Sequence, residues 1–175
     1  DSELLRKGQS LNYYIKVPVN GTFKDIKEVF FDKDLKSQVL NNIWAIGGER
    51  GWYYGNWMWT IRGYIDKLFG GVGLRRGRRS PTEIFTGDSL DFWRVLLADR
   101  EGLRLLLFAE MRLPGEAWLE YKIEEEEDKY KLVQTATFRP RGLFGRLYWG
   151  TMLPFHHFIF GNMANNLVHY KKVKT

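Results

Sequence analysis

Residues 142–172 read GLFGRLYWGTMLPFHHFIFGNMANNLVHYKK, and we expect the rest of the chain to be organised around this segment. At about 3.6 residues per turn, its apolar side chains cover most of a helix circumference as far as Met163. A helix that is apolar nearly all round must be buried on several sides, so we expect the preceding segments to wrap it. Pro154 lacks a backbone N–H and predicts a kink or break inside the helix.

The same stretch raises the alternative of a membrane span. Residues 147–168 contain no Lys, Arg, Asp or Glu and are long enough to cross a bilayer. Pro154, the His156–His157 pair and the asparagines that follow would be costly in lipid. The sequence therefore argues against a membrane span and favours a buried core helix.

The composition favours one globular domain with a substantial core. The chain has 175 residues, of which 44% are hydrophobic and 16% aromatic. An aromatic content this high is typical of a roomy interior or a large partner face. Cysteine is absent and there are only three histidines, so we predict no disulfide and no metal site.

The net charge of +6 is unevenly distributed. A glycine-rich loop carries a group of four arginines, Arg75, Arg76, Arg78 and Arg79. Nucleic acid would need a broader basic face with interleaved aromatics, so we predict no nucleic-acid partner. The loop glycines are one residue off the dinucleotide-binding spacing and no strand-to-helix turn surrounds them. We therefore expect no cofactor within this chain.

The chain starts at Asp1 without a methionine and shows no signal peptide. We expect a fragment excised from a longer cytoplasmic protein. Residues 1–10 have the character of a linker, and residues 11–172 of a single domain.

The amino-terminal half predicts a strand followed by helices. We expect a strand over 11–19, and Thr22 with Asp25 resembles a capping box that opens a helix with Ile26, Val29 and Phe30 inward. A second short helix is expected from Asp34 to Gly47–Gly48.

A short strand over 51–55 and another helix should follow. Asn56 is the candidate cap of a helix over 57–69. Its expected inner face holds four apolar residues, Trp57, Ile61, Ile65 and Leu68, with Tyr64 beside them.

From Ser89 the apolar period changes to two residues, which predicts four strands over 89–98, 103–113, 116–125 and 130–139. Their short connections require an antiparallel meander. The face expected against the last helix comprises Leu103, Leu105, Leu107, Ala109, Met111, Leu119, Tyr121, Ile123, Val133, Thr135 and Thr137. The other face is polar but holds enough apolar residues to need partial covering.

Strand, two helices, antiparallel meander and long final helix is the order of the helix-grip fold, an α+β class with a curved sheet wrapped around the last helix. Four segments, GGVGLRRGRR (70–79), GDSLDFWRV (87–95), AEMRLPGEAWLE (109–120) and QTATFRPRGLFGRLYW (134–149), resemble a bacterial family of the START, Bet v 1 and polyketide-cyclase-like (SRPBCC) superfamily. Members of that family are often fused behind an NAD(P)-binding short-chain dehydrogenase/epimerase domain. The resemblance implies an apolar cavity between sheet and helix, and a Rossmann-type domain in cis that would bring NAD(P). The family has no assigned activity, and fold alone does not define one.

Two glutamates are weak candidates for acid/base chemistry. With the expected hairpin turns, Glu110 lies opposite Glu120, next to Gln134 and near Asp91. Unpaired carboxylates this close would raise one pKa. The simpler interpretation is that arginines satisfy them, either Arg94, Arg112 or the basic loop, and we hypothesise that the loop clamps this acidic row.

The adjacent histidines His156 and His157 are the other weak catalytic candidates. Neighbouring residues on a helix point about 100° apart, so at most one faces a cavity, and a core role is simpler than a general base. The candidate ligand-binding residues are Trp52, Trp57, Trp93, Tyr121, Trp149, Met152 and His156. Ordinary aromatic packing explains any one of them equally well.

Three functions remain open. We favour a module that is not an enzyme on its own and binds an apolar lipid-, isoprenoid- or polyketide-like molecule, serving a fused dehydrogenase domain. The alternatives are a cyclase- or hydratase-like enzyme that uses carboxylates and histidine, and an assembly domain without ligand. A homodimer is one option for the assembly.

Overall fold

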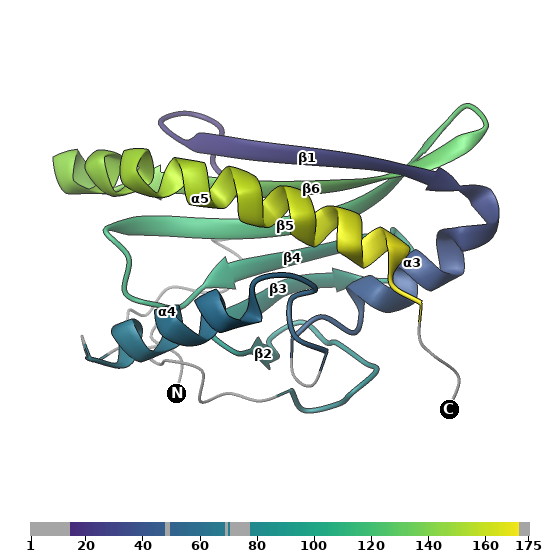
Figure 1. Cartoon of the computed structure of the whole chain (residues 1–175), viewed down its shortest axis with the longest axis horizontal. Coiled ribbons are helices and arrows are strands. Elements are labelled where there is room, and N and C mark those ends of the chain that lie inside the picture. Colours follow the sequence, from purple (N-terminus) through teal and green to yellow (C-terminus); the bar gives the residue numbers. More distant parts are fainter. Residues whose placement is uncertain (1–14, 48–49, 69, 71–77, 172–175) are drawn as a thin grey trace.

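A long helix crosses the inner face of a curved, six-stranded antiparallel sheet in the computed structural model of the chain (Figure 1). The structure describes residues 15–47, 50–68, 70 and 78–171. The elements in chain order are β1 (Phe23–Asp32), the 3-10 turn η1 (Lys33–Leu35), α3 (Lys36–Ile43), α4 (Asn56–Leu68), β2 (Ser89–Leu90), β3 (Trp93–Asp99), β4 (Arg104–Ala109), β5 (Gly115–Glu126), β6 (Lys129–Pro140) and α5 (Gly142–His169). The strands lie in the order β1-β6-β5-β4-β3-β2. This is the helix-grip fold that the sequence predicts.

The first strand is where the sequence predicts a helix. β1 pairs with β6 along its whole length, whereas residues 15–19 of the expected first strand lie outside any strand. Asp25 and Phe31 are buried, while Ile26 and Phe30 are about half exposed, which is the alternation of a strand. An apolar pattern this short is compatible with the period of a helix or of a strand. Pairing with β6 satisfies the backbone hydrogen-bonding groups of these residues and therefore favours the strand.

The meander is confirmed, with one change of face. Leu105, Leu107, Leu119 and Tyr121 lie in the inner core as predicted. The inner residues of β6 are even-numbered instead of odd, because Glu126 pairs with Lys129 across a two-residue turn and Tyr121 pairs with Gln134. Directly paired residues share a face, so a one-residue difference in turn length exchanges the two faces of the whole strand.

The strand predicted over 89–98 is in fact two strands. A turn at Asp91 separates β2 from β3, and Asp91 has a φ of 53°. Aspartate is one of the few residues that tolerate this left-handed conformation. The turn folds β2 back onto β3 as the last strand of the sheet.

Two predictions around α4 are wrong. Residues 51–55 form no strand, only one isolated bridge from Gly51 to Gly47. α4 exposes the face expected to be inside, with 65% of Trp57 and 83% of Leu68 accessible to solvent. Trp59 packs on the core instead. Amphipathic spacing identifies the apolar face of a helix, but it does not show whether another element covers that face.

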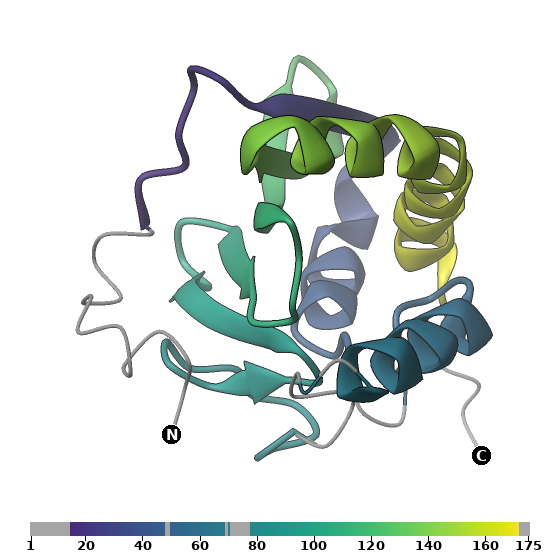
Figure 2. The same cartoon turned by 90° about the vertical axis from the view of Figure 1, so that its left-hand side faces the viewer.

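α5 is one unbroken helix that includes Pro154, so the predicted break is wrong. Figure 2 shows its axis changing direction between its two halves, in agreement with the predicted kink. Its carboxyl-terminal half is wrapped as expected and buries Phe160, Met163 and Leu167. Its amino-terminal half is only partly covered, because Trp149 is buried whereas Phe144 is 83% exposed.

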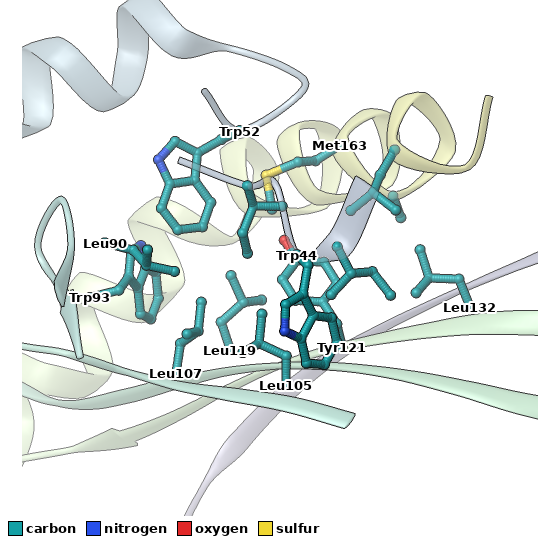
Figure 3. Close-up of a cluster of buried hydrophobic side chains, with 14 of the residues drawn as sticks. Trp44, Trp52, Leu90, Trp93, Leu105, Leu107, Leu119, Tyr121, Leu132 and Met163 are labelled. Atoms are coloured by element: carbon teal, nitrogen blue, oxygen red, sulfur yellow. The ribbon is translucent and has the colours of Figure 1, made fainter. Parts of the chain in front are cut away.

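The core has an inner and an outer part. Figure 3 shows part of the inner cluster, where Tyr121 lies among Trp44, Leu105 and Leu119. The outer cluster on the other face of the sheet contains Leu96, Leu106, Phe108 and Trp118. Ile15 and Val17 of the amino-terminal segment pack against it, which confirms that this face is partly covered. None of the helices in the described part of the chain is long and apolar enough to cross a bilayer.

Candidate functional site

A cavity of about 320 Å³ lies between the inner face of the sheet, α4 and the amino-terminal half of α5. Its lining is apolar apart from Thr137, His156, the Tyr148 hydroxyl and tryptophan N–H groups. The remaining lining residues are Trp57, Met58, Trp59, Ile61, Trp93, Ala109, Met111, Leu113, Ala117, Trp118, Ala136, Phe138, Trp149, Met152, Phe155, Ile159 and Phe160. The arrangement can hold an apolar molecule and offers it few hydrogen bonds.

Stacked rings form one wall. The ring of Trp149 lies between Phe138 and Phe23, with centroid distances of 5.5 and 5.7 Å and interplanar angles below 10°. α5 supplies Trp149, and β6 and β1 supply the two phenylalanines. Such stacking fixes the rings in one orientation, so this wall is preformed.

Tryptophans form the opposite side. Trp59 of α4 contacts Phe92 and Phe160, with ring centroids 5.7 and 6.2 Å apart. It also contacts Trp52, which in turn contacts Trp93 at 6.0 Å. These contacts tie the inner side of α4 to β3 and α5, and they leave Trp57 and Ile61 at the cavity's exposed edge.

Only one of the two adjacent histidines faces the cavity, as their helical spacing predicts. His156 lines it and makes edge-to-face contacts with Trp149 and Phe160 at 5.2 and 5.0 Å. His157 points to β1, where its Nδ1 lies 2.7 Å from the Nζ of Lys27. The ammonium group of Lys27 must donate, so this Nδ1 accepts and carries no proton. Lys27 also pairs with Asp25 at 2.7 Å, and the three groups join α5 to the edge strand.

The structure brings five of the seven predicted ligand-binding residues to the cavity. These are Trp57, Trp93, Trp149, Met152 and His156. The other two, Trp52 and Tyr121, are core residues.

Trp52 and Tyr121 have separate surroundings. The Nε1–H of Trp52 donates to Asp91 Oδ2 at 2.8 Å. Burial raises the pKa of Asp91, and this hydrogen bond partly offsets the rise. Tyr121 is fully buried, and burial raises its pKa well above the ordinary value.

The sequence did not identify several lining residues, among them Phe138, Tyr148 and Phe155. Phe138 was missed because β6 was assigned to the wrong face. Tyr148 and Phe155 lie near Trp149 and Met152 on the helix surface, so i, i+3 and i+4 spacing from those residues could have found them.

The acidic row predicted on the sheet does not exist. Glu120 pairs with Thr135 and lies opposite Leu106, not Glu110, because a five-residue connection over 110–114 separates β4 from β5. Both glutamates share the outer face, away from the cavity. Glu110 accepts two hydrogen bonds of 3.1 Å from Arg94, and Glu120 accepts one of 2.6 Å from Arg104. The simpler interpretation, that arginines satisfy them, is therefore correct.

The basic loop does not clamp these glutamates through its described residues. Arg75 and Arg76 lie outside the part of the chain that the structure describes. Arg78 donates to the carbonyl oxygens of Ile46 and Trp44 at 2.7 and 2.8 Å, and burial lowers its pKa.

The next arginine is also occupied elsewhere. Arg79 lies 3.5 Å from Asp88 and over the ring of Phe85. Among the described residues, no group of three His, Asp or Glu is arranged to hold a metal ion.

Comparison with known proteins places the chain in a family. No curated protein matches it in sequence. The chain is similar to the structure of TTHA0849 from Thermus thermophilus, with 13% identity, a TM-score of 0.43 and coverage of 84% of this chain and 95% of that one. Norcoclaurine synthase from Thalictrum flavum is 8% identical, with a TM-score of 0.44 and coverage of 85% of this chain and 87% of that one. CalU16 from Micromonospora echinospora is 12% identical, with a TM-score of 0.39 and coverage of 83% of this chain and 84% of that one. The family described as "Protein of unknown function (DUF2867)" matches residues 20–163, and the chain belongs to it.

Proposed function

We propose that the chain binds an apolar small molecule of lipid-, isoprenoid- or polyketide-like chemistry in the cavity between the sheet and α5. The cavity itself carries this proposal. Its volume of about 320 Å³ falls at the lower end of the range typical of small-molecule sites, which is roughly 300–1,000 Å³. An apolar lining gains free energy by removing apolar ligand surface from water.

The polar groups suit orientation better than catalysis. The Tyr148 hydroxyl and His156 are separate polar points in an otherwise apolar wall, whereas Thr137 occupies an outward-facing position of β6. The described lining holds no carboxylate, because Glu110 and Glu120 are on the other face of the sheet and engaged by arginines. Because neither Glu110 nor Glu120 reaches this cavity, a binding module is better supported than a cyclase or hydratase that uses carboxylates.

A separate part of the proposal is that this module supports an NAD(P)-binding dehydrogenase domain in the same protein. It rests on the family resemblance of the sequence. In that arrangement the cavity would hold the substrate or product of the neighbouring domain.

The first test is mass spectrometry of the freshly purified protein under native and denaturing conditions. We expect a small apolar molecule that is retained in the native spectrum and lost on denaturation. A second measurement is the affinity for N-phenyl-1-naphthylamine, a neutral apolar probe whose fluorescence rises in apolar sites.

Two variants make the probe assay specific for the cavity. Ala117→Trp fills space at the cavity wall and should weaken probe binding by about tenfold or more, because a methyl-sized side chain becomes an indole. Tyr121→Phe is the matched control, since Tyr121 is in the core and does not line the cavity. Equal probe affinity in Ala117→Trp and the unaltered protein would contradict the proposal.

A further inference from the structure

Apolar side chains remain uncovered beside the cavity on two helices. On α4 they are Trp57, Ile61, Tyr64 and Leu68, with exposures between 49% and 83%. On α5 they are Phe144, Leu147, Phe155 and Phe158, with exposures between 54% and 83%. The spacing in each set puts its members on one face of its helix. We call these two stripes together the apolar rim.

The apolar rim is continuous with the cavity. Trp57 and Ile61 of one stripe and Phe155 of the other also line the cavity. Figure 2 shows α4 and α5 on the same side of the sheet. Exposed apolar residues gathered around a cavity mouth mark an interaction surface rather than the scattered exposure of an ordinary protein surface.

The charge around the apolar rim is mostly positive, although α4 itself contains Asp66 next to Lys67. No Asp or Glu occurs between residues 129 and 175, and the first turn of α5 has no acidic residue. Arg141 and Arg146 are exposed at the amino-terminal end of α5, where the helix dipole adds positive potential. At the far end of α4, Lys67 is exposed, and a Cβ at Gly70 would lie 3.7 Å from the guanidinium of Arg112.

We propose that the apolar rim docks on the surface of an anionic lipid bilayer. Leucine, phenylalanine and tryptophan side chains enter the boundary between headgroups and acyl chains, while the flanking cations contact lipid phosphates. Tryptophan and tyrosine are the residues that favour this boundary, and the α4 stripe contains one of each. The contact requires no membrane span, so it agrees with the sequence argument against one.

A second copy of the chain fits this surface less well. In a twofold dimer the same surface meets itself, so the basic flanks of both copies would be brought into one interface. Like charges brought together at an interface oppose association. An anionic bilayer matches both the apolar rim and its basic flanks.

Docking in this orientation brings the cavity mouth to the acyl-chain layer. An apolar ligand could then pass between membrane and cavity without crossing water. This route rests on the proposed function, but the docking itself does not, because it can be measured without a ligand.

The test is co-sedimentation with vesicles. We expect binding to vesicles of equimolar phosphatidylcholine and phosphatidylglycerol, and weaker binding to phosphatidylcholine alone and at high salt. Leu68→Glu combined with Phe144→Glu should weaken binding by about tenfold or more, since each change places a carboxylate in the apolar rim. Ile26→Glu with Phe30→Glu is the matched control, because these residues are 53% and 51% exposed on β1, outside the apolar rim. The control should bind as the unaltered protein does.

Three results would overturn the proposal. The first is no binding of the protein to the anionic vesicles. The second is an equal loss of vesicle binding in the rim variant (Leu68→Glu with Phe144→Glu) and the control variant (Ile26→Glu with Phe30→Glu). The third is a dimer, detected by light scattering, that dissociates in the rim variant. Binding of the fluorescent probe tests the cavity separately from membrane docking, because Leu68 and Phe144 do not line the cavity. The rim variant should therefore bind N-phenyl-1-naphthylamine normally.

Discussion

Gly145 lies where the first turns of α5 press against the chain that precedes them. A Cβ at this position would lie 2.8 Å from Pro140 Cα and closer still to the carbonyl oxygen of Pro114. Moving these backbone atoms apart costs free energy in the folded state, so Gly145→Ala should destabilise the protein by about 1–3 kcal/mol. Gly150→Ala is the control in the same helix, with no atom within 4 Å of the new methyl group, and should stabilise by about 0.5–1 kcal/mol. Denaturant unfolding measures both, and equal effects would contradict the close approach at Gly145.

Asp91 combines a left-handed φ with a buried carboxyl group. Its pKa is raised by burial above the ordinary value of 3.8. The stability linked to its neutral form is therefore present below pH 3.8 and is lost as the pH rises through the folded-state pKa. Asp91→Asn keeps an acceptor for Trp52 and a residue that tolerates this φ, but it cannot ionise. The variant should gain stability relative to the unaltered protein as the pH rises above 3.8, as followed by unfolding at several pH values. A difference independent of pH would show that the ionisation of Asp91 is not involved.

Ion pairs on the outer face of the sheet link neighbouring strands. Arg94 of β3 holds Glu110, just beyond β4, and the Glu110 side chain has no accessible surface. Glu110→Ala leaves a buried guanidinium uncompensated, so we expect a loss of about 3–5 kcal/mol in the free energy of unfolding. Glu120→Ala is the matched control: its pair with Arg104 joins β4 to β5 but is partly exposed. It should cost less than about 1 kcal/mol. Similar losses in the two variants would mean that burial does not govern these pairs.

The two halves of α5 differ although their sequences are similarly apolar. The second half buries Phe160, Met163 and Leu167, whereas the first half buries Trp149 against β1 and β6 and leaves its outer stripe exposed beside the cavity. An apolar helix sequence predicts that burial would be favourable, but coverage depends on which elements the topology places over it.

At the scale of the whole molecule, the sheet has apolar residues on both faces. Val17 packs on the outer cluster with Leu106 and Trp118, whereas Val19, two residues later, is 74% exposed. Val17→Asp places a carboxylate against apolar side chains and should destabilise the protein by about 1–3 kcal/mol. Val19→Asp should change the stability by less than about 0.5 kcal/mol. Thermal or denaturant unfolding measures both, and equal stability of the two variants would show that residues 15–17 do not cover this face.

The amino-acid sequence alone predicted the fold class, the antiparallel meander, the long last helix and five of the seven residues expected at the cavity. The meander and the last helix follow from local periods and short connections, which are properties of neighbouring residues, whereas the cavity was implied by the family resemblance. It also indicated that the outer face of the sheet is partly covered, and that only one of His156 and His157 faces the cavity.

The remaining features depend on contacts between distant parts of the chain. The pairing of β1 with β6, the inner face of β6 and the separation of Glu110 from Glu120 depend on partners and turn lengths far from the residues concerned. A one-residue change in a turn exchanges the faces of a strand, and a connection of five residues moves a carboxylate out of register. The exposure of α4 and of the first half of α5 has the same origin. Hydrophobic periodicity shows which face gains from burial, whereas the arrangement of the whole chain decides whether that face is covered.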